Sequence, residues 1–548
     1  MDRRIFLKGA LATGALALTG LDSQFARAAK AQWNPMNALP TELSKPSLGE
    51  QQLADQLINY ARSLGASYCD IRMSRYLSQS VSARDNTVTG ISDNESYGIG
   101  IRVIKDGSWG FTATRNVNEE GGKRAVDEAI AMAAANAKLR PEPLDLVPVD
   151  KVIAEWKTPI KSNPFEVSFK QRAEFLLTLH ALALGAKPAG KKMFIHSSLT
   201  AGREEKYFAS SEGSKIWQEI TRIDPSTHIT MSDPKKGEFA SRSLFVLPQG
   251  RGMEYVENYP YHDEIAVAVA EASEKLTAES VKSGKYDLIL HPTHLWLTIH
   301  ESIGHPTELD RIYGYEANFA GTSFLRKKDV KDFTYGSDLL NVVADRTQDG
   351  GLATCGYDDD GVACESYDLI KKGELVGIQT TREQARMVKE DKSHGQSYAQ
   401  GWWNVPFQRM PNVSLQPNPK KMSLDDLIKD TGNGILIKGN SSYSIDQQRY
   451  NFQFTGQVAY AVKNGKLGGM LRDVAYQATT QKFWKSMDGL CDQTEYMLGG
   501  AMNDGKGEPM QSNPLSHGCP PARFSGIQVI NTKSQSANSK GGMLDYEG

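Results

Sequence analysis

The chain has 548 residues, with 63 Lys and Arg side chains against 65 Asp and Glu, so its formal net charge is −2. This small negative charge gives no electrostatic basis for binding nucleic acid or an anionic membrane surface. The five cysteines (Cys69, Cys355, Cys364, Cys491 and Cys519) are odd in number and form no C-x-x-C pair, which argues against a disulfide framework and an iron–sulfur centre.

The N-terminus has the pattern of an export signal. Arg3 and Arg4 form a twin-arginine pair, a mildly apolar stretch follows, and Ala26-Arg27-Ala28 offers a small-x-small cleavage site. This pattern predicts a twin-arginine signal peptide over residues 1–28 and a linker or surface arm over residues 29–49. We therefore expect export of the folded protein to the periplasm. No stretch of the sequence reaches the roughly 18 consecutive apolar residues of a membrane span, so none is expected.

The first half of the remaining chain alternates between helical and strand patterns. Apolar residues recur at helical spacing in some segments and at every second position in others. The pattern predicts an N-terminal domain of helices and sheet over residues 50–284, ending near Ser283-Gly284-Lys285. The expected helices are 50–65, 121–139, 167–184 and 263–282, and the expected strands are 68–81, 88–103, 196–200, 204–209, 214–222 and 227–231.

The second half, residues 285–548, is expected to be mostly β. The apolar residues 286–290 predict a buried strand that leads into a helix starting near Pro292 or Thr293. Further on, three strands separated by turns predict a meander, and Asn464-Gly465 is a strong hairpin signal. The fold class is therefore α+β. The three strands are 434–438, 452–463 and 466–472.

The segment His300-Glu301-Ser302-Ile303-Gly304-His305 carries the most chemical information. Imidazoles are the usual ligands of a catalytic zinc ion, and a carboxylate beside one ligand can take a proton from a metal-bound water. The spacing is i, i+5, which places the two rings roughly 140° apart on an ideal helix of 3.6 residues per turn. The helix must therefore end or bulge near Gly304, where glycine is permissive and Pro306 disfavours helical geometry at the residue before it.

This motif resembles that of the TldD/TldE (PmbA) metallopeptidases, and other segments follow in the order found in that family. The resemblance extends over residues 49–530. It implies a peptidase that takes unfolded or leader-type peptides and works as a homodimer or with a TldE-like partner subunit. The matching segments begin at Gly98, His300, Gly321, Asp359, Gly373, Ser397 and Pro406.

The sequence offers more than one candidate for the third metal ligand. In the family that the chain resembles, the third ligand is a cysteine in a late glycine-rich turn, and here Asp504 occupies its place. Aspartate is a competent zinc ligand and would favour harder metals. Cys519 and His517 are alternatives, and loss of the metal is a third possibility. The expected cofactor is one divalent ion, zinc being the first candidate, held by His300, His305 and Asp504.

These observations predict a metal-dependent peptidase in which Glu301 is the general base. The alternative is a non-catalytic peptide-binding protein or partner subunit of a TldD/TldE-like complex. A redox enzyme, the third class suggested by twin-arginine export, has no glycine-rich dinucleotide fingerprint to support it.

Overall fold

The computed structural model describes residues 45–140 and 142–533. The predicted signal peptide and most of the predicted linker lie outside these residues. By its internal contacts the chain falls into two units, one formed by residues 44–164 and 169–548 and the other by residues 1–43 and 165–168. The sheets and the candidate site belong to the first unit.

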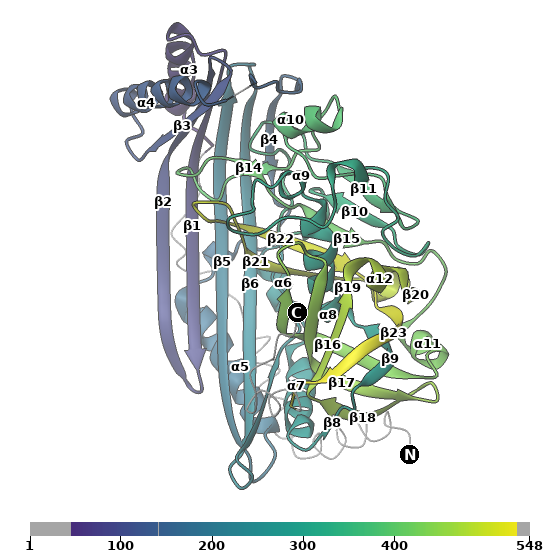
Figure 1. Cartoon of the computed structure of the whole chain (residues 1–548). Coiled ribbons are helices and arrows are strands. Elements are labelled where there is room, and N and C mark those ends of the chain that lie inside the picture. The colour runs from purple at the N-terminus through teal and green to yellow at the C-terminus, as the bar shows by residue number, and fades with distance from the viewer. Residues whose placement is uncertain (1–44, 141, 534–548) are drawn as a thin grey trace, which may run out of the picture. The chain divides into compact units, whose positions relative to one another are not determined.

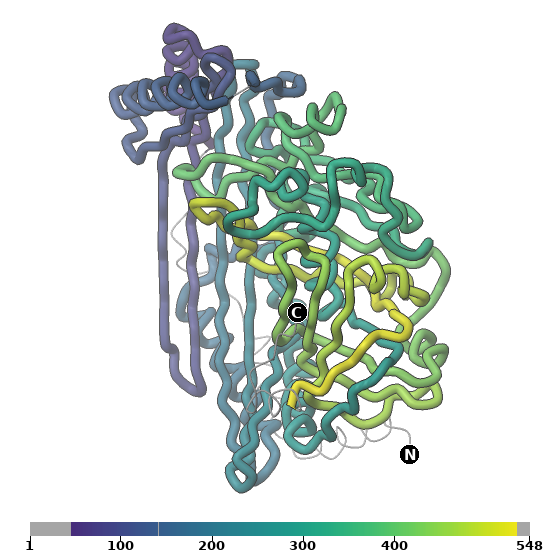
Figure 2. Tube along the Cα trace, viewed as in Figure 1, coloured from purple at the N-terminus to yellow at the C-terminus, as the bar shows by residue number. Residues whose placement is uncertain are grey.

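A large sheet of long strands dominates the N-terminal half (Figure 1). Its order is β3-β2-β1-β5-β6-β4, with β7 also on β6; every pairing is antiparallel except that of β4 with β6. The two hairpins β1–β2 and β5–β6 run side by side along its length (Figure 2). The strands are β1 Tyr68–Arg84, β2 Thr87–Lys105, β3 Ser108–Thr114, β4 Ile153–Lys157, β5 Lys192–Ser210, β6 Lys215–Asp233 and β7 Glu238–Ser243.

The helices of this half cover parts of the sheet through small and apolar faces. Helix α3 starts at a capping box on Ser47, and its buried residues, including Leu57, pack with α4 on β1 to β3. The expected helices are confirmed to within two residues, except for the last one: α7 ends at Lys275, because the short strand β8 follows. The helices are α3 Leu48–Ser63, α4 Glu119–Ala137, α5 Phe169–Ala186, α6 Met253–Glu257 and α7 Tyr261–Lys275.

The four short strands expected between residues 196 and 231 are wrong, because the structure has two long strands there, β5 and β6. Pro225 lies inside β6. It pairs with Leu199 of β5 at a point where β6 is bonded to neither β4 nor β7. A proline without an N–H is tolerated on such an open edge, so the strand continues.

The C-terminal half is built around a second sheet that closes on itself. Its order is β16-β9-β23-β19-β17-β18-β8, β20 joins β23, and β16 also pairs with β17. The predicted meander and its Asn464-Gly465 turn are confirmed by β16, β17 and β18. The strands are β8 Glu279–Ser280, β9 Gly284–Leu290, β16 Asn433–Ile445, β17 Asn451–Lys463, β18 Lys466–Arg472, β19 Val474–Thr479, β20 Met487–Leu490 and β23 Ala522–Asn531.

Three smaller sheets and an apolar core complete this half. The core gathers buried side chains from the closed sheet and the neighbouring elements, with Phe483 stacked on Phe524 at 4.0 Å between ring centroids. One small sheet has the order β12-β11-β10-β15, the second pairs β13 (Ser397–Tyr398) with β14 (Phe407–Gln408), and the third is the hairpin β21–β22. Their other strands are β10 Val342–Asp345, β11 Ser366–Lys371, β12 Glu374–Leu375, β15 Asn412–Leu415, β21 Met497–Lys506 and β22 Gln511–Cys519.

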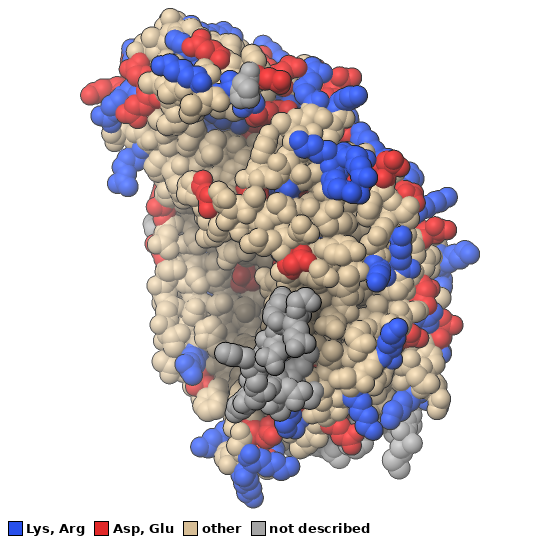
Figure 3. All heavy atoms as spheres, viewed as in Figure 1, with Lys and Arg blue, Asp and Glu red and all other residues tan. Residues whose placement is uncertain are grey.

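The α+β fold class is confirmed by this arrangement. Strand β9 begins at Gly284; the division into domains 50–284 and 285–548 stays a prediction. Within the described residues, no helix is long and apolar enough to cross a membrane. On the face shown in Figure 3, acidic and basic side chains are interspersed around the periphery. All five cysteines are free thiols.

Candidate metal centre

The histidine motif follows the buried strand β9 directly. His291 caps α8 (Pro292–Ile299), its ring accepting from the Thr293 N–H at 3.3 Å, and Pro292 occupies the first helical turn. Leu295, Ile299 and Ile303 fall four residues apart and are fully buried in the core. Strand and core together fix the direction in which the following residues leave the helix.

The predicted break in the helix is confirmed, and it takes the form of a π-helical turn. Residues His300–Gly304 are π-helical, and His305–Thr307 form a 3-10 turn. The backbone N–H of His305 bonds to the carbonyl of His300, an i→i+5 contact that stacks the two residues on one side of the chain. Their ring centroids are 4.4 Å apart. One extra residue in the turn therefore does what an i, i+4 spacing does in a regular helix.

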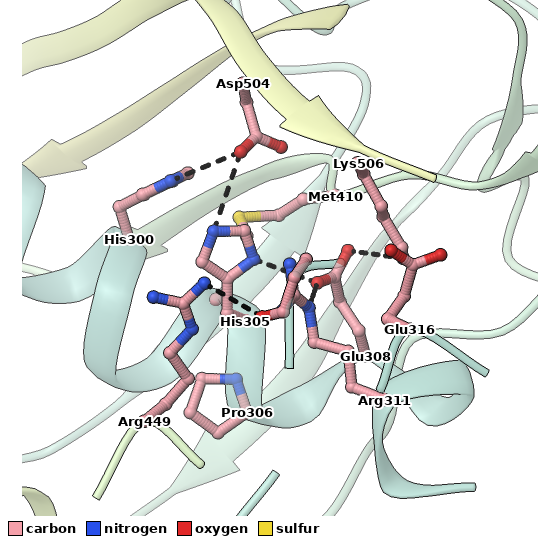
Figure 4. A network of polar contacts seen from close by, with 12 residues as sticks. His300, His305, Pro306, Glu308, Arg311, Glu316, Met410, Arg449, Asp504 and Lys506 are labelled. Atoms are coloured by element: carbon pink, nitrogen blue, oxygen red, sulfur yellow. Dashed lines mark hydrogen bonds and ion pairs between the residues drawn. The ribbon is translucent and has the colours of Figure 1, made fainter. Parts of the chain in front are cut away.

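Asp504 faces both histidines from strand β21 (Figure 4). Its Oδ1 lies 3.5 Å from Nε2 of His300 and 3.5 Å from Nε2 of His305. The three side chains are buried, and their ligating atoms lie within 4.8 Å of one another. Two imidazole nitrogens and one carboxylate oxygen are a donor set that suits zinc or a harder divalent ion.

Neither alternative ligand belongs to this cluster of ligating atoms. The Sγ of Cys519 is 3.9 Å from the carbonyl of Pro292, and burial raises the pKa of its thiol, which disfavours a thiolate. Both ring nitrogens of His517 are already bonded, one to His300 and one to the carbonyl of Val413. Of the three candidates, the structure brings only Asp504 face to face with the histidine pair.

The charges of the site favour an ionised carboxylate beside a neutral imidazole. Burial raises the pKa of Asp504, but His305, His300 and Arg409 together hold it well below its usual range. Burial, Arg311 and His300 lower the pKa of His305 well below its ordinary value. A metal ligand must be deprotonated to bind, and Asp504 and His305 are in that form. Burial lowers the pKa of His300, but its contact with Asp504 raises it above the ordinary value, so an ion would compete with a proton there.

A buried network of charges lies behind His305 (Figure 4). The Nδ1 of His305 is 2.9 Å from Oε2 of Glu308, which Arg311 also contacts at 2.5 Å. Lys506 Nζ lies 2.9 Å from Glu308 Oε1 and 2.7 Å from Asp310 Oδ2. The negative charges of two buried carboxylates are therefore balanced by the positive charges of Arg311 and Lys506. By accepting from Nδ1, Glu308 turns Nε2 of His305 towards Asp504.

Glu301 lies in the same π-helical turn and is 4% exposed. Its Oε2 accepts a hydrogen bond from Nη1 of Arg449 at 2.9 Å. Arg449 sits in the turn between β16 and β17 with a positive φ of 63°, and the carboxylate of Asp446 accepts from the two backbone N–H groups that follow it. This turn holds the guanidinium against Glu301.

Sequence reasoning missed three of these contacts. Glu308 was visible only as part of the resemblance, although its position three residues after His305 puts the two on one helix face. Arg449 and Lys506 are 148 and 198 residues from their partners Glu301 and Glu308, and nothing in the local sequence signals those pairings.

Three segments of the chain match models of known protein-family domains. Residues 69–133, 162–278 and 283–531 match, in that order, the PmbA/TldA metallopeptidase domain 1, central domain and C-terminal domain. The chain belongs to the PmbA/TldD metallopeptidase family. The resemblance inferred from the sequence motifs is thereby confirmed.

Members of the PmbA/TldD family with curated names are similar to the chain over most of its length. A metalloprotease of Methanocaldococcus jannaschii is 27% identical over 444 residues, covering 81% of this chain and 94% of the relative. The zinc metalloprotease TldD homolog of Saccharolobus solfataricus is 24% identical over 436 residues, covering 77% and 88%. These names support a metallopeptidase role, and zinc appears in the second of them.

Solved structures share the PmbA/TldD fold. TldE from Thermococcus kodakarensis superposes with a TM-score of 0.67 at 17% identity, covering 87% of this chain and all of that one. A candidate modulator of DNA gyrase from Thermotoga maritima gives a TM-score of 0.66 at 15% identity, covering 88% and 100%. At this identity the likeness concerns the fold alone.

Proposed function

We propose that this chain is a metal-dependent peptidase, that His300, His305 and Asp504 hold one divalent ion, and that Glu301 is the general base. The observation that supports it most is the convergence of two imidazole nitrogens and a carboxylate oxygen within 4.8 Å, in the turn that also carries Glu301. Zinc is the expected ion, because the donor set suits it and a relative is named a zinc metalloprotease.

The bound ion would supply Lewis acidity and a water whose pKa is about 7. Glu301 would take a proton from that water and return it to the leaving amine of a cleaved peptide bond. Arg449 keeps the Glu301 carboxylate in one orientation through its 2.9 Å contact. Glu308 holds the ring of His305, which leaves Asp504 as the charged member of the ligand set.

Exchange of Glu301 for glutamine tests the assignment, because it removes the base but keeps the shape of the side chain. Glu301→Gln should retain about one metal per chain and lose hydrolysis of an unfolded protein by about 10²-fold or more. Glu128→Gln, on the exposed face of α4, is the matched control and should behave as the parent protein. Hydrolysis that survives in Glu301→Gln would defeat the proposal.

Asp504→Ala tests the ligand set in the same way. It should lose the metal, measured by elemental mass spectrometry, together with hydrolysis. Cys519→Ala should keep both, because its thiol lies against Pro292 and not in the ligand cluster. Metal lost from Cys519→Ala and kept by Asp504→Ala would assign the site to the cysteine.

The alternative function is a non-catalytic peptide-binding or partner subunit. The ion pair between Glu301 and Arg449 supports it, since a carboxylate engaged by a guanidinium is less available as a base. The two functions differ in one measurement: a chelator abolishes hydrolysis by a peptidase, and a binding subunit shows no hydrolysis to abolish.

Assembly and location are further parts of this proposal. We expect a homodimer, or a heterodimer with a TldE-like subunit, acting on peptides or unfolded proteins; the family membership supports this, and light scattering of the purified chain tests it. We also expect twin-arginine export to the periplasm, supported by Arg3 and Arg4. Replacing both by lysine and fractionating cells tests this, and unchanged export would contradict it.

A further inference from the structure

His517 lies behind His300, on the side away from Asp504. It belongs to strand β22 and is fully buried. Its Nε2 is 2.9 Å from Nδ1 of His300, and its Nδ1 is 2.7 Å from the carbonyl oxygen of Val413 in strand β15. A continuous chain of hydrogen bonds therefore runs from the backbone of β15 through His517 to the ring of His300.

The positions of the protons in this chain follow from its two ends. A carbonyl oxygen can only accept, so His517 must carry a proton on Nδ1. The ring of His517 is fully buried, and its two nitrogens are bonded to a carbonyl oxygen and to another imidazole, neither of which is an anion that would compensate a second proton. Its Nε2 is then an acceptor, and the proton between the two rings belongs to Nδ1 of His300.

This arrangement leaves the Nε2 lone pair of His300 directed at the metal position. The Oδ1 of Asp504 lies 3.5 Å from that nitrogen. On the other side, Glu308 accepts from Nδ1 of His305 and produces the same tautomer there. Two histidines with protonated Nδ1 atoms and one carboxylate then present lone pairs to one point, which is the electrostatic condition for a cation.

The ring of His517 cannot easily turn away. The indole of Trp296 stacks on it with an interplanar angle of 11° at 6.3 Å between ring centroids. The strand that carries it is tied to β15 by the hydrogen bond from the Gly518 N–H to Ser414 Oγ, at 2.8 Å. The acceptor is thus held in place from two directions.

The two groups that accept from the metal-binding histidines differ in charge: Glu308, behind His305, is an anion, and His517, behind His300, is neutral. Glu308 is an anion buried at 0% exposure, and it lies against both Arg311 and Lys506. An isolated buried carboxylate would be costly. A neutral imidazole supplies a comparable acceptor without a charge that needs compensation, and it leaves the net charge of the ligand set to Asp504.

We propose that His517 is a positioning residue of the metal centre: the chain Val413–His517–His300 fixes the orientation and the tautomer of His300, and His517 is not itself a ligand. This inference rests on the proposed function only where it predicts an effect of His517 on metal affinity. The hydrogen-bond chain, with a proton on Nδ1 of both histidines, does not need the metal, so the two can be tested apart.

The first test is the tautomeric state of the unaltered, metal-free protein, read from ¹⁵N-labelled histidine side chains by NMR. Among the signals of the ten histidines, those of His517 and His300 are assigned by their loss in His517→Gln and His300→Gln. We expect the proton of His517 on Nδ1 and that of His300 on Nδ1. A proton on Nε2 of His517 would overturn the proposal. This result does not depend on whether the protein binds a metal, so it separates the inference from the proposed function.

The second test is Zn²⁺ affinity, measured by competition with a chromophoric chelator. His517→Leu removes the acceptor and should weaken binding about 10- to 100-fold, whereas in His517→Gln the amide oxygen can replace Nε2 and should restore most of the affinity. His262→Leu, at an exposed histidine of α7, is the control and should bind as the parent does. Melting curves confirm that each variant is folded.

Two outcomes would overturn the proposal. Unchanged affinity in His517→Leu would show that the chain of hydrogen bonds does not position His300. Equal and complete loss of Zn²⁺ in folded His517→Leu and His517→Gln would show that the role is not that of an acceptor. Absence of Zn²⁺ binding in the parent protein would instead refute the proposed function and leave the tautomer measurement to decide this inference.

Discussion

Lys506 is the side chain whose removal should destabilise the region of the metal centre most. Its ammonium is fully buried and lies 2.9 Å from Glu308 Oε1, 2.7 Å from Asp310 Oδ2 and 2.9 Å from the carbonyl of Gln408. With Arg311 it balances the two carboxylates. Lys506→Met preserves much of the volume but leaves one negative charge uncompensated, and breaking a buried ion pair in this way costs about 3–5 kcal/mol of unfolding free energy.

A double-mutant cycle separates the charge from the loss of packing. Asp310→Asn in the Lys506→Met background restores neutrality, since Arg311 still pairs with Glu308 at 2.5 Å. The double variant should therefore be more stable than Lys506→Met alone, with a coupling energy of about 1–3 kcal/mol. Urea unfolding followed by tryptophan fluorescence measures all four proteins. A loss below about 1 kcal/mol in Lys506→Met, or no recovery in the double variant, would refute the reasoning.

Three further changes test other parts of the structure. Burial raises the pKa of Glu205 from 4.5 to about 7, so between these pH values the folded state holds a proton that the unfolded state has released. The free energy of unfolding should therefore fall by up to about 3 kcal/mol as the pH rises through this range. Glu205→Gln should abolish that fall, measured by urea unfolding at pH 5 and pH 8. A Cβ on Gly110 would lie 1.9 Å from the carbonyl oxygen of Ala129 in α4. Gly110→Ala should therefore displace α4 and lower the free energy of unfolding by about 1–3 kcal/mol. Faster amide exchange in that helix would show the displacement, and unchanged exchange would contradict the packing. Arg449→Met should lower hydrolysis about 10- to 100-fold with metal content unchanged if the guanidinium orients Glu301, and a higher rate would show that the ion pair is inhibitory.

The sequence predicted the turns and helix breaks that are set by the conformational preferences of neighbouring residues. The Asn464-Gly465 turn imposes its hairpin through positive φ at both residues, and the structure has it. The break at Gly304 followed from the angle between two histidines on a helix, and the π-helical turn satisfies it. By contrast, the expected end of helix 263–282 failed, because the pairing of β8 with β18 ends α7 and no local signal marks that pairing.

The site itself divides in the same way. His300, Glu301 and His305 lie within six residues and were visible at once, and Asp504 was visible only through the family's order of motifs. The side chains that orient them are brought together by sheet pairing, so their partners could not be read from sequence. His517 illustrates this: it was one of two alternative ligands, and only the contact with Val413 on a neighbouring strand shows that its nitrogens are engaged.

The contact between Lys506 and Glu308 joins residues 198 positions apart, and Asp504 stands beside Lys506 on the same strand. At a translation rate of about 5–20 residues per second, about 10–40 s pass between synthesis of the histidine motif and synthesis of this strand. A nascent or prematurely ended chain therefore carries the histidine pair and Glu301 without the carboxylate that faces them. The order of synthesis therefore keeps this cluster of side chains incomplete until strand β21 has been made.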